Sequence, residues 1–235
     1  MALASTAGGR APRAVTFDVF GTLIDPGGAV DALRAHVPEA HKVAQSWRRH
    51  QLEISWLLSL IERYEDFDRV TVYALDTALA ETGVALSAAA REEILDALAR
   101  LPAYDDVAAA LERLESEGFA LAVLSNGSPR MLESTLAAAG IRGWFQQVIS
   151  VDEVRVYKPS PTVYRHAAKR LGVAPGEVWL VSGNPFDCAG AKAAGLGVAK
   201  LERGASFAYA FAEPADLTLS SLEELADSLG TSRLQ

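Results

Sequence analysis

Hydrophobic residues change their spacing twice along the chain, and these changes divide it into three segments. An apolar run at residues 15–20 predicts one buried strand near the start. Residues 28–100 show helical spacing almost throughout, with breaks near Pro38 and Gly83. Beyond Pro102, helical and strand patterns alternate. The chain is therefore expected to contain a long helical block inserted after its first strand.

The third segment predicts four helices, each followed by a glycine and then a strand. Glycine takes the left-handed conformation at a helix end without steric cost, so it is expected there. The expected pairs are helix 105–117 with strand 120–124, helix 129–139 with strand 147–150, helix 160–171 with strand 178–181, and helix 187–194 with strand 197–200. Such alternation predicts an α/β fold with a doubly wound parallel sheet. We predict a core from residues 1–25 and 103–235, and an inserted α-helical cap at 26–102.

One expected cap helix, residues 42–64, has two apolar stripes on a helical wheel. The first contains Trp47, Ile54, Leu57, Leu58 and Ile61, and the second contains Leu52, Trp56 and Leu60. A polar strip of Arg48, Ser55 and Ser59 separates them. The helix is either buried on two sides within the cap or turns one stripe toward a second subunit. Because apolar surfaces often mark such contacts, we expect a homodimer through helix 42–64.

Composition and charge narrow the classes of partner. The 235 residues, 50% hydrophobic and 22% charged, are enough for one sizeable core. A net charge of -8 argues against a nucleic-acid partner or a membrane surface, and no apolar run approaches the ~20 residues of a membrane span. The single Cys188 fits a reducing cytoplasm. Residues 1–13 lack the apolar stretch of a secretory signal and are expected to form a tail.

Polar residues gather where four of the predicted strands end. They are Asp18 and Thr22, then Ser125 and Asn126, then Lys158, and finally Ser182, Asn184 and Asp187. Each group alone is a weak signal, because a carboxylate can cap a helix and Ser-Asn-Gly can form a turn. In an open parallel sheet, however, ligands bind at the carboxyl ends of the strands. Four polar ends on one sheet edge therefore favour a functional site.

The order of these motifs resembles that of the haloacid dehalogenase superfamily. The matching segments are Phe-Asp-x-x-Gly-Thr-Leu, Leu-Ser-Asn-Gly, Tyr-Lys-Pro and a terminal Asp, and they cover nearly the whole chain from Ala14 onward. The cap segment is similar to the L-2-haloacid dehalogenases in Trp47-Arg48-x-x-Gln51-Leu52-x-x-x-Trp56 and in Arg63-Tyr64-x-x-Phe67. The resemblance implies a Rossmann-like core with a cap, and a hydrolase acting on a small 2-haloacid.

Two positions separate this chain from the Mg-dependent phosphatases that make up most of that superfamily. Those enzymes need an Asp two residues after the nucleophile and an acidic residue four positions before the last motif's final Asp. Here the two positions hold Phe20 and Gly183. Phe cannot transfer a proton, and Gly supplies no oxygen ligand for magnesium. Since a halide leaves without a proton, we predict dehalogenation to a 2-hydroxyacid with no metal and no cofactor.

Two alternatives stay open at this point. The chain could be a Mg-dependent small-molecule phosphatase of the same superfamily, or a non-catalytic binding protein that keeps the fold. Magnesium-stimulated turnover of a phosphate ester would identify the first, and the absence of any adduct with a haloacid would identify the second.

Asp18 is the expected nucleophile, which attacks C2 of the substrate and forms an ester on the enzyme. Lys158 is its expected partner, because a nearby cation keeps a carboxylate ionised. Thr22, Ser182 and Asn184 are expected to orient the carboxylate, and Asp187 to position or activate the hydrolytic water. The alternatives are a structural carboxylate at a turn for Asp18, a surface lysine for Lys158, and a helix N-cap for Asp187.

The remaining expected residues bind the substrate. Arg48 and Asn126 are expected to bind the departing halide. The alternative for Arg48 is a helix residue that points into solvent. By analogy with the family, the substrate carboxylate lies against the backbone N–H groups of Val19 and Phe20 and the Ser125 hydroxyl. Phe20, Phe67 and Phe186 are expected to form apolar walls, and Tyr164 matches a family tyrosine, although all four could simply be core residues.

Three residues depart from the pattern of the close dehalogenases. Those proteins usually have Tyr where this chain has Phe20, and Trp where it has Phe186, and Pro185 is unexpected in the last motif. We expect these differences to reshape the substrate pocket.

Overall fold

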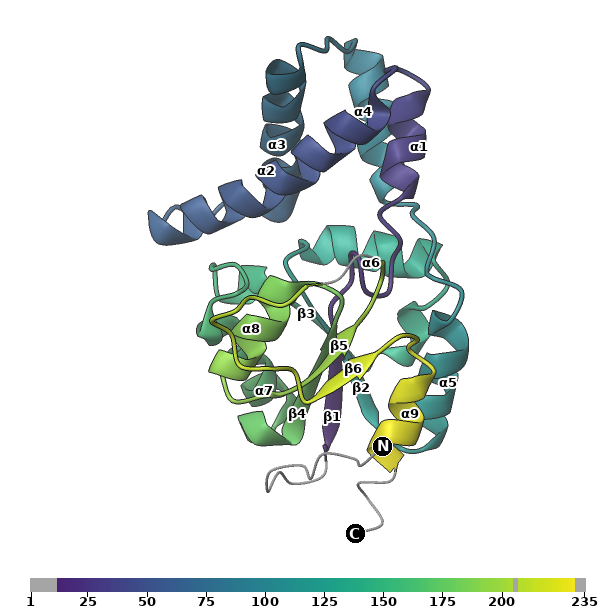
Figure 1. Ribbon diagram of the computed structural model, residues 1–235, viewed down its shortest axis with the longest axis vertical. Helices are drawn as coiled ribbons and strands as arrows, with labels where there is room; N and C mark the ends of the chain where they lie inside the picture. Colours follow the sequence, from purple (N-terminus) through teal and green to yellow (C-terminus); the bar gives the residue numbers. More distant parts are fainter. Residues whose placement is uncertain (1–11, 205–206, 231–235) are drawn as a thin grey trace.

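A parallel β-sheet lies at the centre of the computed structural model, which describes residues 12–204 and 207–230 (Figure 1). Its strands are β1 (Ala14–Phe17), β2 (Ala120–Ser125), β3 (Gln147–Ser150), β4 (Val178–Ser182), β5 (Gly197–Leu201) and β6 (Leu217–Leu219). They lie in the order β3-β2-β1-β4-β5-β6, and all neighbouring pairs are parallel. The chain winds outward from β1 to β3 and returns to the other side of β1 for β4. This is the predicted doubly wound sheet.

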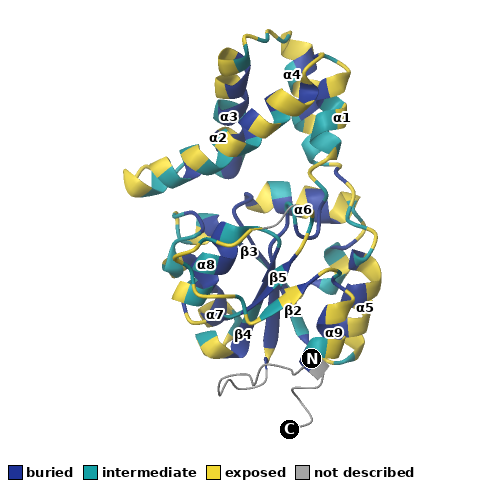
Figure 2. Cartoon of the chain, viewed as in Figure 1, coloured by how far each residue is buried: buried dark blue, intermediate teal, exposed yellow. Residues whose placement is uncertain are grey.

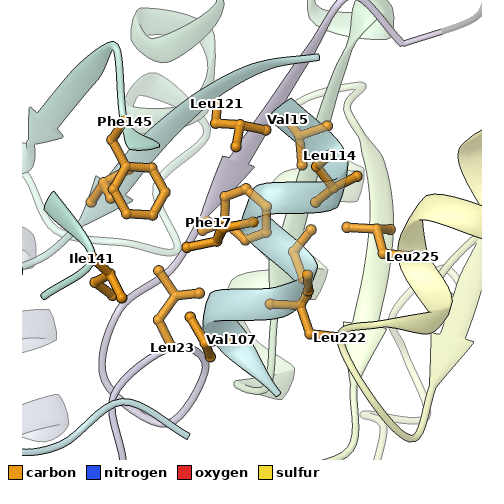
Figure 3. Packing of buried hydrophobic residues seen from close by; sticks show 14 of the residues in the cluster. Val15, Phe17, Leu23, Val107, Leu114, Leu121, Ile141, Phe145, Leu222 and Leu225 are labelled. Atoms are coloured by element: carbon orange, nitrogen blue, oxygen red, sulfur yellow. The ribbon is translucent and has the colours of Figure 1, made fainter. Parts of the chain in front are cut away.

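Helices cover both faces of the sheet. The hydrophobic cluster on one face involves α5 (Val107–Ser116), α6 (Pro129–Ala138) and α9 (Glu224–Gly230), and the cluster on the other involves α7 (Pro161–Leu171) and α8 (Pro185–Ala193). In the first cluster, Phe17 of β1 packs among Leu121, Leu114 and Leu222 (Figure 3). Short 3-10 helices complete the core at Arg142–Trp144, Val151–Glu153 and Pro175–Glu177.

The segment between β1 and α5 folds into four helices with a hydrophobic cluster of their own. These are α1 (Gly28–Arg34), α2 (Ala40–Leu60), α3 (Phe67–Thr82) and α4 (Ala88–Leu98). Leu33, Trp47, Leu75 and Ile94 are buried between them. The helices stand beside one end of the sheet, with their buried sides turned toward one another (Figures 1 and 2).

The apolar and polar stripes predicted for helix α2 contact different parts of the molecule. On the first stripe, Trp47 is buried and donates to the carbonyl oxygen of Thr71 in α3 at 2.9 Å. On the polar strip, Ser59 Oγ accepts a hydrogen bond from the backbone N–H of Tyr157 in the core at 3.0 Å. The last turn carries large exposed apolar side chains, namely Leu57 (51% exposed), Leu60 (79%) and Ile61 (57%).

Most predicted elements lie within two residues of those observed, with four differences. Strand β1 stops at Phe17 rather than Phe20, because the chain turns back and three N–H groups donate to the carbonyl oxygen of Val19. Helix α2 ends at Leu60 rather than at 64, since Glu62 has a left-handed φ of 56°. Strand β6 and helix α9 had no counterpart in the sequence prediction. Of the expected tail, residues 1–11 lie outside the described residues.

The sequence also predicted that no segment spans a membrane and that Cys188 is reduced. In the part of the chain that the structure describes, no helix combines the length and hydrophobicity needed to span a bilayer. Cys188 is buried and carries a free thiol.

Candidate active site

Asp18 follows β1 directly and is almost buried, with 7% of its surface exposed. Its Oδ2 accepts hydrogen bonds from Thr22 Oγ1 (3.0 Å) and Asn184 Nδ2 (2.7 Å). Its Oδ1 accepts from Lys158 Nζ at the longer distance of 3.2 Å. The site lies between the ends of β1 and β4, where the winding of the sheet reverses and ligands are expected to bind.

The loop after Asp18 has a shape that its sequence explains. Gly21 has a φ of 80°, a conformation that side chains rarely permit. This turn brings the Thr22 hydroxyl to Asp18, and the same oxygen accepts the backbone N–H of Gly183 at 2.9 Å. Thr22 thus joins the loop after β1 to the loop after β4.

Lys158 lies between two carboxylates and is 1% exposed. Its Nζ donates to Asp187 Oδ2 at 2.8 Å as well as to Asp18 Oδ1. Burial lowers the pKa of Lys158, but the two negative charges outweigh that effect and the pKa is raised. Its backbone N–H donates to Asn126 Oδ1 at 3.0 Å. Lys158 is therefore a buried, charged partner of Asp18 and not a surface lysine.

Asp187 is fully buried in the first turn of α8. Its Oδ1 accepts a hydrogen bond from the Tyr164 hydroxyl at 2.7 Å, and its Oδ2 accepts from Lys158. Burial raises the pKa of Asp187, although Lys158 opposes this. The N-cap residue of α8 is Asn184, so the alternative of Asp187 as an N-cap is wrong. Tyr164 is buried in α7 and makes a polar contact in addition to packing.

Arg48 reaches this cluster from α2. Its Nη2 donates to Asn184 Oδ1 at 3.4 Å, and Asn184 in turn donates to Asp18. Burial lowers the pKa of Arg48, while the charge of Asp18 acts in the opposite direction. Among the described residues, its guanidinium has no carboxylate in ion-pair contact. Arg48 therefore brings a positive charge with spare donors next to Asp18.

Ser125 and Asn126 lie at the end of β2, and both are buried. Ser125 Oγ accepts the backbone N–H of Gly127 at 3.2 Å. The backbone N–H groups of Val19 and Phe20 have no hydrogen-bond acceptor among residues 12–204 and 207–230. These two N–H groups are thus unused by the described chain, and the binding of the substrate carboxylate by them and by Ser125 stays a prediction.

Ser182 has a different neighbour from the one expected. Its Oγ accepts the backbone N–H of Asn184 at 3.1 Å, and within the described chain no hydrogen bond joins it to Asp18. Ser182 therefore stabilises the turn that carries Asn184 and does not orient the Asp18 carboxylate directly.

The three phenylalanines that were expected to form apolar walls line two different cavities. Phe20 and Phe67 line a cavity of about 570 Å³ together with Arg48. Phe186 instead packs edge-on against Trp56 with ring centroids 5.6 Å apart, and lines a second cavity of about 660 Å³. Phe186 therefore does not line the cavity that Arg48, Phe20 and Phe67 share, where the sequence had led us to expect all three aromatic walls. Consecutive helix residues point about 100° apart, so a buried Asp187 directs Phe186 elsewhere.

Two contacts near the site had not been anticipated. Trp56 Nε1 in α2 donates to the carbonyl oxygen of Lys158 at 3.1 Å. Arg203 donates to the carbonyl oxygen of Thr22 from Nε (3.1 Å) and Nη2 (3.0 Å), and pairs with Asp106. Arg203 follows the end of β5, so extending the strand-end rule to a fifth strand would have found it. Trp56 had been named in an apolar stripe and in the cap motif, but no contact with the site had been expected of it.

Comparison with known proteins identifies the family. The family model described as haloacid dehalogenase-like hydrolase matches residues 12–195. The chain belongs to this family. It is 40% identical to (S)-2-haloacid dehalogenase 1 of Pseudomonas sp. (strain CBS-3), over 92% of this chain and 96% of that protein. It is 42% identical to (S)-2-haloacid dehalogenase of Xanthobacter autotrophicus, over 81% of this chain and 75% of that protein. The resemblance read from the motifs is confirmed.

A solved structure shows the same architecture. The L-2-haloacid dehalogenase from Xanthobacter autotrophicus with chloropropionic acid covalently bound has a TM-score of 0.88 and 35% identity. The match covers 93% of this chain and 98% of that one. It confirms the fold class.

The donor set near Asp18 does not fit the magnesium site common in this family. Both carboxylates, Asp18 and Asp187, are already bound by the Lys158 ammonium, which would repel a cation. A Cβ at Gly183 would lie 2.3 Å from the carbonyl oxygen of Gly21. An acidic side chain at that position therefore requires a shift of the backbone.

Proposed function

We propose that this protein hydrolyses small (S)-2-haloacids to 2-hydroxyacids through an ester on Asp18, without a metal. One observation carries the proposal: the buried Asp18 has one oxygen held by two neutral donors and the other held only by Lys158. The names of the relatives, (S)-2-haloacid dehalogenases, and the covalently bound chloropropionic acid in the Xanthobacter enzyme support it. No contact of these residues favours a phosphatase.

In the first step, Asp18 Oδ1 attacks C2 of the substrate. A new carbon–oxygen bond forms as the carbon–halogen bond breaks, and the halide leaves with the bonding electron pair. Oδ1 is the better nucleophile because it has fewer hydrogen bonds than Oδ2. In this proposal Lys158, the only donor to Oδ1 among the described residues, lies beside the reactive oxygen. Displacement from the rear inverts C2, so an L-haloacid gives a D-hydroxyacid.

The departing halide needs a positive environment rather than a proton. The Arg48 guanidinium and the Asn126 side-chain amide are the proposed donors. Two unit charges 4 Å apart attract by ~4 kcal/mol at an effective dielectric of 20, against ~1 kcal/mol in water. The burial that lowers the pKa of Arg48 therefore also strengthens its attraction for the halide.

In the second step, water attacks the carbonyl carbon of the Asp18 ester. Asp187 takes one proton of the water, the ester carbon–oxygen bond breaks, and the hydroxyacid leaves with the original Oδ1 and a proton returned from Asp187. The other proton of the water stays on the Asp18 carboxyl and is then released to solvent, which restores the carboxylate. The raised pKa of Asp187 makes it a stronger base. Both of its oxygens already accept one hydrogen bond, and each keeps a further lone pair for water.

The substrate carboxylate is proposed to bind the backbone N–H groups of Val19 and Phe20 and the Ser125 hydroxyl. Backbone donors suit an anion, and these two N–H groups have no acceptor in the described chain. With the carboxylate held there, C2 lies beside Asp18.

The test is halide release from (S)-2-chloropropionate in the presence of EDTA. We expect turnover by the natural chain and none by Asp18→Asn. The control is Asp31→Asn, which changes an exposed aspartate of α1 that pairs with Arg34. Halide release by Asp18→Asn at the natural rate would contradict the proposal.

The proposal also covers the division into domains, the oligomeric state and the location in the cell. The separate hydrophobic cluster of α1–α4 supports the division into a core, 1–25 and 103–235, and a cap, 26–102. The exposed Leu57, Leu60 and Ile61 support a homodimer through α2, and Leu60→Glu should then give a monomer in light scattering. The lone cysteine in the sequence supports a cytoplasmic location.

A further inference from the structure

The cavity of about 570 Å³ beside the active site is larger than its proposed substrate needs. Cavities of roughly 300–1,000 Å³ hold drug-sized ligands, whereas 2-chloropropionate carries only a methyl group on C2. The lining comes from the loop after β1, from all four cap helices, from the segment leading back to the core and from the start of α6. Most of it is apolar, as in Phe20, Val30, Leu52 and Leu101.

Two lining residues connect the cavity to the reacting atoms. Phe20 stands two residues after Asp18, and Arg48 contacts Asn184, which donates to Asp18. The cavity is therefore reached from the place where C2 and the halide must lie. Polar side chains such as Gln45 and Gln51 also line it, but the halide and the substrate carboxylate already have donors in Arg48 and in the backbone N–H groups of the loop after β1.

We infer that this cavity binds the apolar substituent on C2, so that the preferred substrates are 2-haloacids with alkyl chains longer than methyl. The inference rests on the proposed function and adds the substrate class. Of the three substituents on C2 that need a site, only an alkyl chain gains by leaving water for an apolar surface. Small side chains leave the room for it: Ala29 in α1 and Ala44 in α2 both line the cavity.

The size of the effect follows from burial of each added methylene. A buried CH₂ contributes about 0.8 kcal/mol, which corresponds to a factor of about four in an equilibrium constant. Because a chain bound in the cavity is held in the ground state and the transition state alike, the gain should appear mainly as a lower KM.

The experiment measures kcat/KM for halide release from the (S) enantiomers of 2-chloropropionate, 2-chlorobutanoate and 2-chlorohexanoate. We expect kcat/KM to rise along the series by up to about four-fold per methylene, mainly through KM. Turnover of 2-chloropropionate with an equal or lower kcat/KM for 2-chlorohexanoate would overturn this inference and leave the proposed function standing. Failure to release halide from any of the three would overturn both.

A filling variant tests the location of the bound chain. Ala44→Phe should lower the ratio of kcat/KM for 2-chlorohexanoate over 2-chloropropionate at least ten-fold, and Ala29→Leu provides a second filling variant from α1. The control, Ala35→Phe, enlarges an exposed alanine at the end of α1 that does not line the cavity. It should leave both the ratio and the activity unchanged. Natural ratios in both filling variants would overturn the inference.

Discussion

Asn184 Nδ2 lies 2.7 Å from Oδ2 of Asp18, although the two residues are 166 positions apart in the chain. The contact exists because β1 and β4 are adjacent and parallel, so that their carboxyl ends meet at the same sheet edge. Asn184 also donates to the carbonyl oxygen of Phe20 at 3.0 Å and accepts from Arg48. One amide thus fixes the nucleophile, its loop and the cap arginine relative to one another.

Thr22→Val tests whether Thr22 supports activity by orienting the Asp18 carboxylate or only by stabilising the fold. The change keeps the shape of the side chain but removes the bond to Asp18 and the acceptor for the Gly183 N–H. We expect kcat/KM to fall roughly 10- to 100-fold, less than for loss of a whole oxyanion donor, because Asn184 still holds Oδ2. Halide-release kinetics measure the effect.

Thr16→Val is the matched control for that variant. Thr16 is buried in β1 and donates to the carbonyl oxygen of Trp179, without touching Asp18. Both variants should lose about 1–2 kcal/mol of unfolding free energy in urea, since each leaves a buried group without its partner. Only Thr22→Val should lose activity, and an equal loss in Thr16→Val would assign the effect to stability.

Arg48→Gln should remove the positive charge that receives the halide. A contribution of ~4 kcal/mol at 4 Å corresponds to as much as about 10³-fold in rate, so kcat should fall by roughly 10²- to 10³-fold. Lys42→Gln removes a charge from an exposed position of the same helix, where Lys42 pairs with Glu39. Its activity should match that of the natural chain. Equal losses in the two variants would point to the net charge of the cap instead.

Lys158→Met should destabilise the fold as well as abolish turnover. It leaves Asp18 and Asp187 buried without their shared cation, and breaking a buried ion pair costs about 3–5 kcal/mol. Urea unfolding measures this loss. Lys169→Met alters an exposed lysine of α7 and should stay within about 0.5 kcal/mol of the natural value. A fully stable Lys158→Met would show that the pairing is not needed for folding.

Cys188 should not react with haloacetate substrates, although it lies next to Asp187. Burial, aided by the charge of Asp187, raises the pKa of Cys188 to about 12. The thiolate is the reactive form, so it is nearly absent at pH 8. Intact-protein mass spectrometry after many turnovers of chloroacetate should therefore show no added mass on Cys188. Stoichiometric alkylation accompanied by loss of activity would contradict this expectation.

The sequence predicted the core well because its signals are local. Strand and helix periodicity placed the elements of the sheet, and the glycines after four helices, at 118, 140, 172 and 195, all have a positive φ. The end of α2 was misplaced because Glu62 adopts a left-handed conformation that its residue type does not signal. Strand β6 spans only Leu217–Leu219, too short for a periodic pattern to stand out.

The site was predicted as a set of strand ends, but its contacts were not. The rule for parallel sheets brought Asp18, Lys158 and Asn184 to one edge, and the family resemblance supported that grouping. Neither indicates the direction in which a side chain points. For this reason Ser182 was expected to orient Asp18, and Phe186 was expected to form a wall with Phe20. Arg203 was missed because the strand-end rule was not extended to β5, and its bond to the Thr22 carbonyl oxygen depends on tertiary packing.

A single turnover in ¹⁸O water, with enzyme in excess over (S)-2-chloropropionate, tests the central claim most directly. If Asp18 forms the ester and water attacks its carbonyl carbon, one ¹⁸O atom should enter the Asp18 peptide, and the lactate should carry none. Label found in the hydroxyl group of the product, with Asp18 unlabelled, would show that water attacks C2 directly and that Asp18 is not the nucleophile.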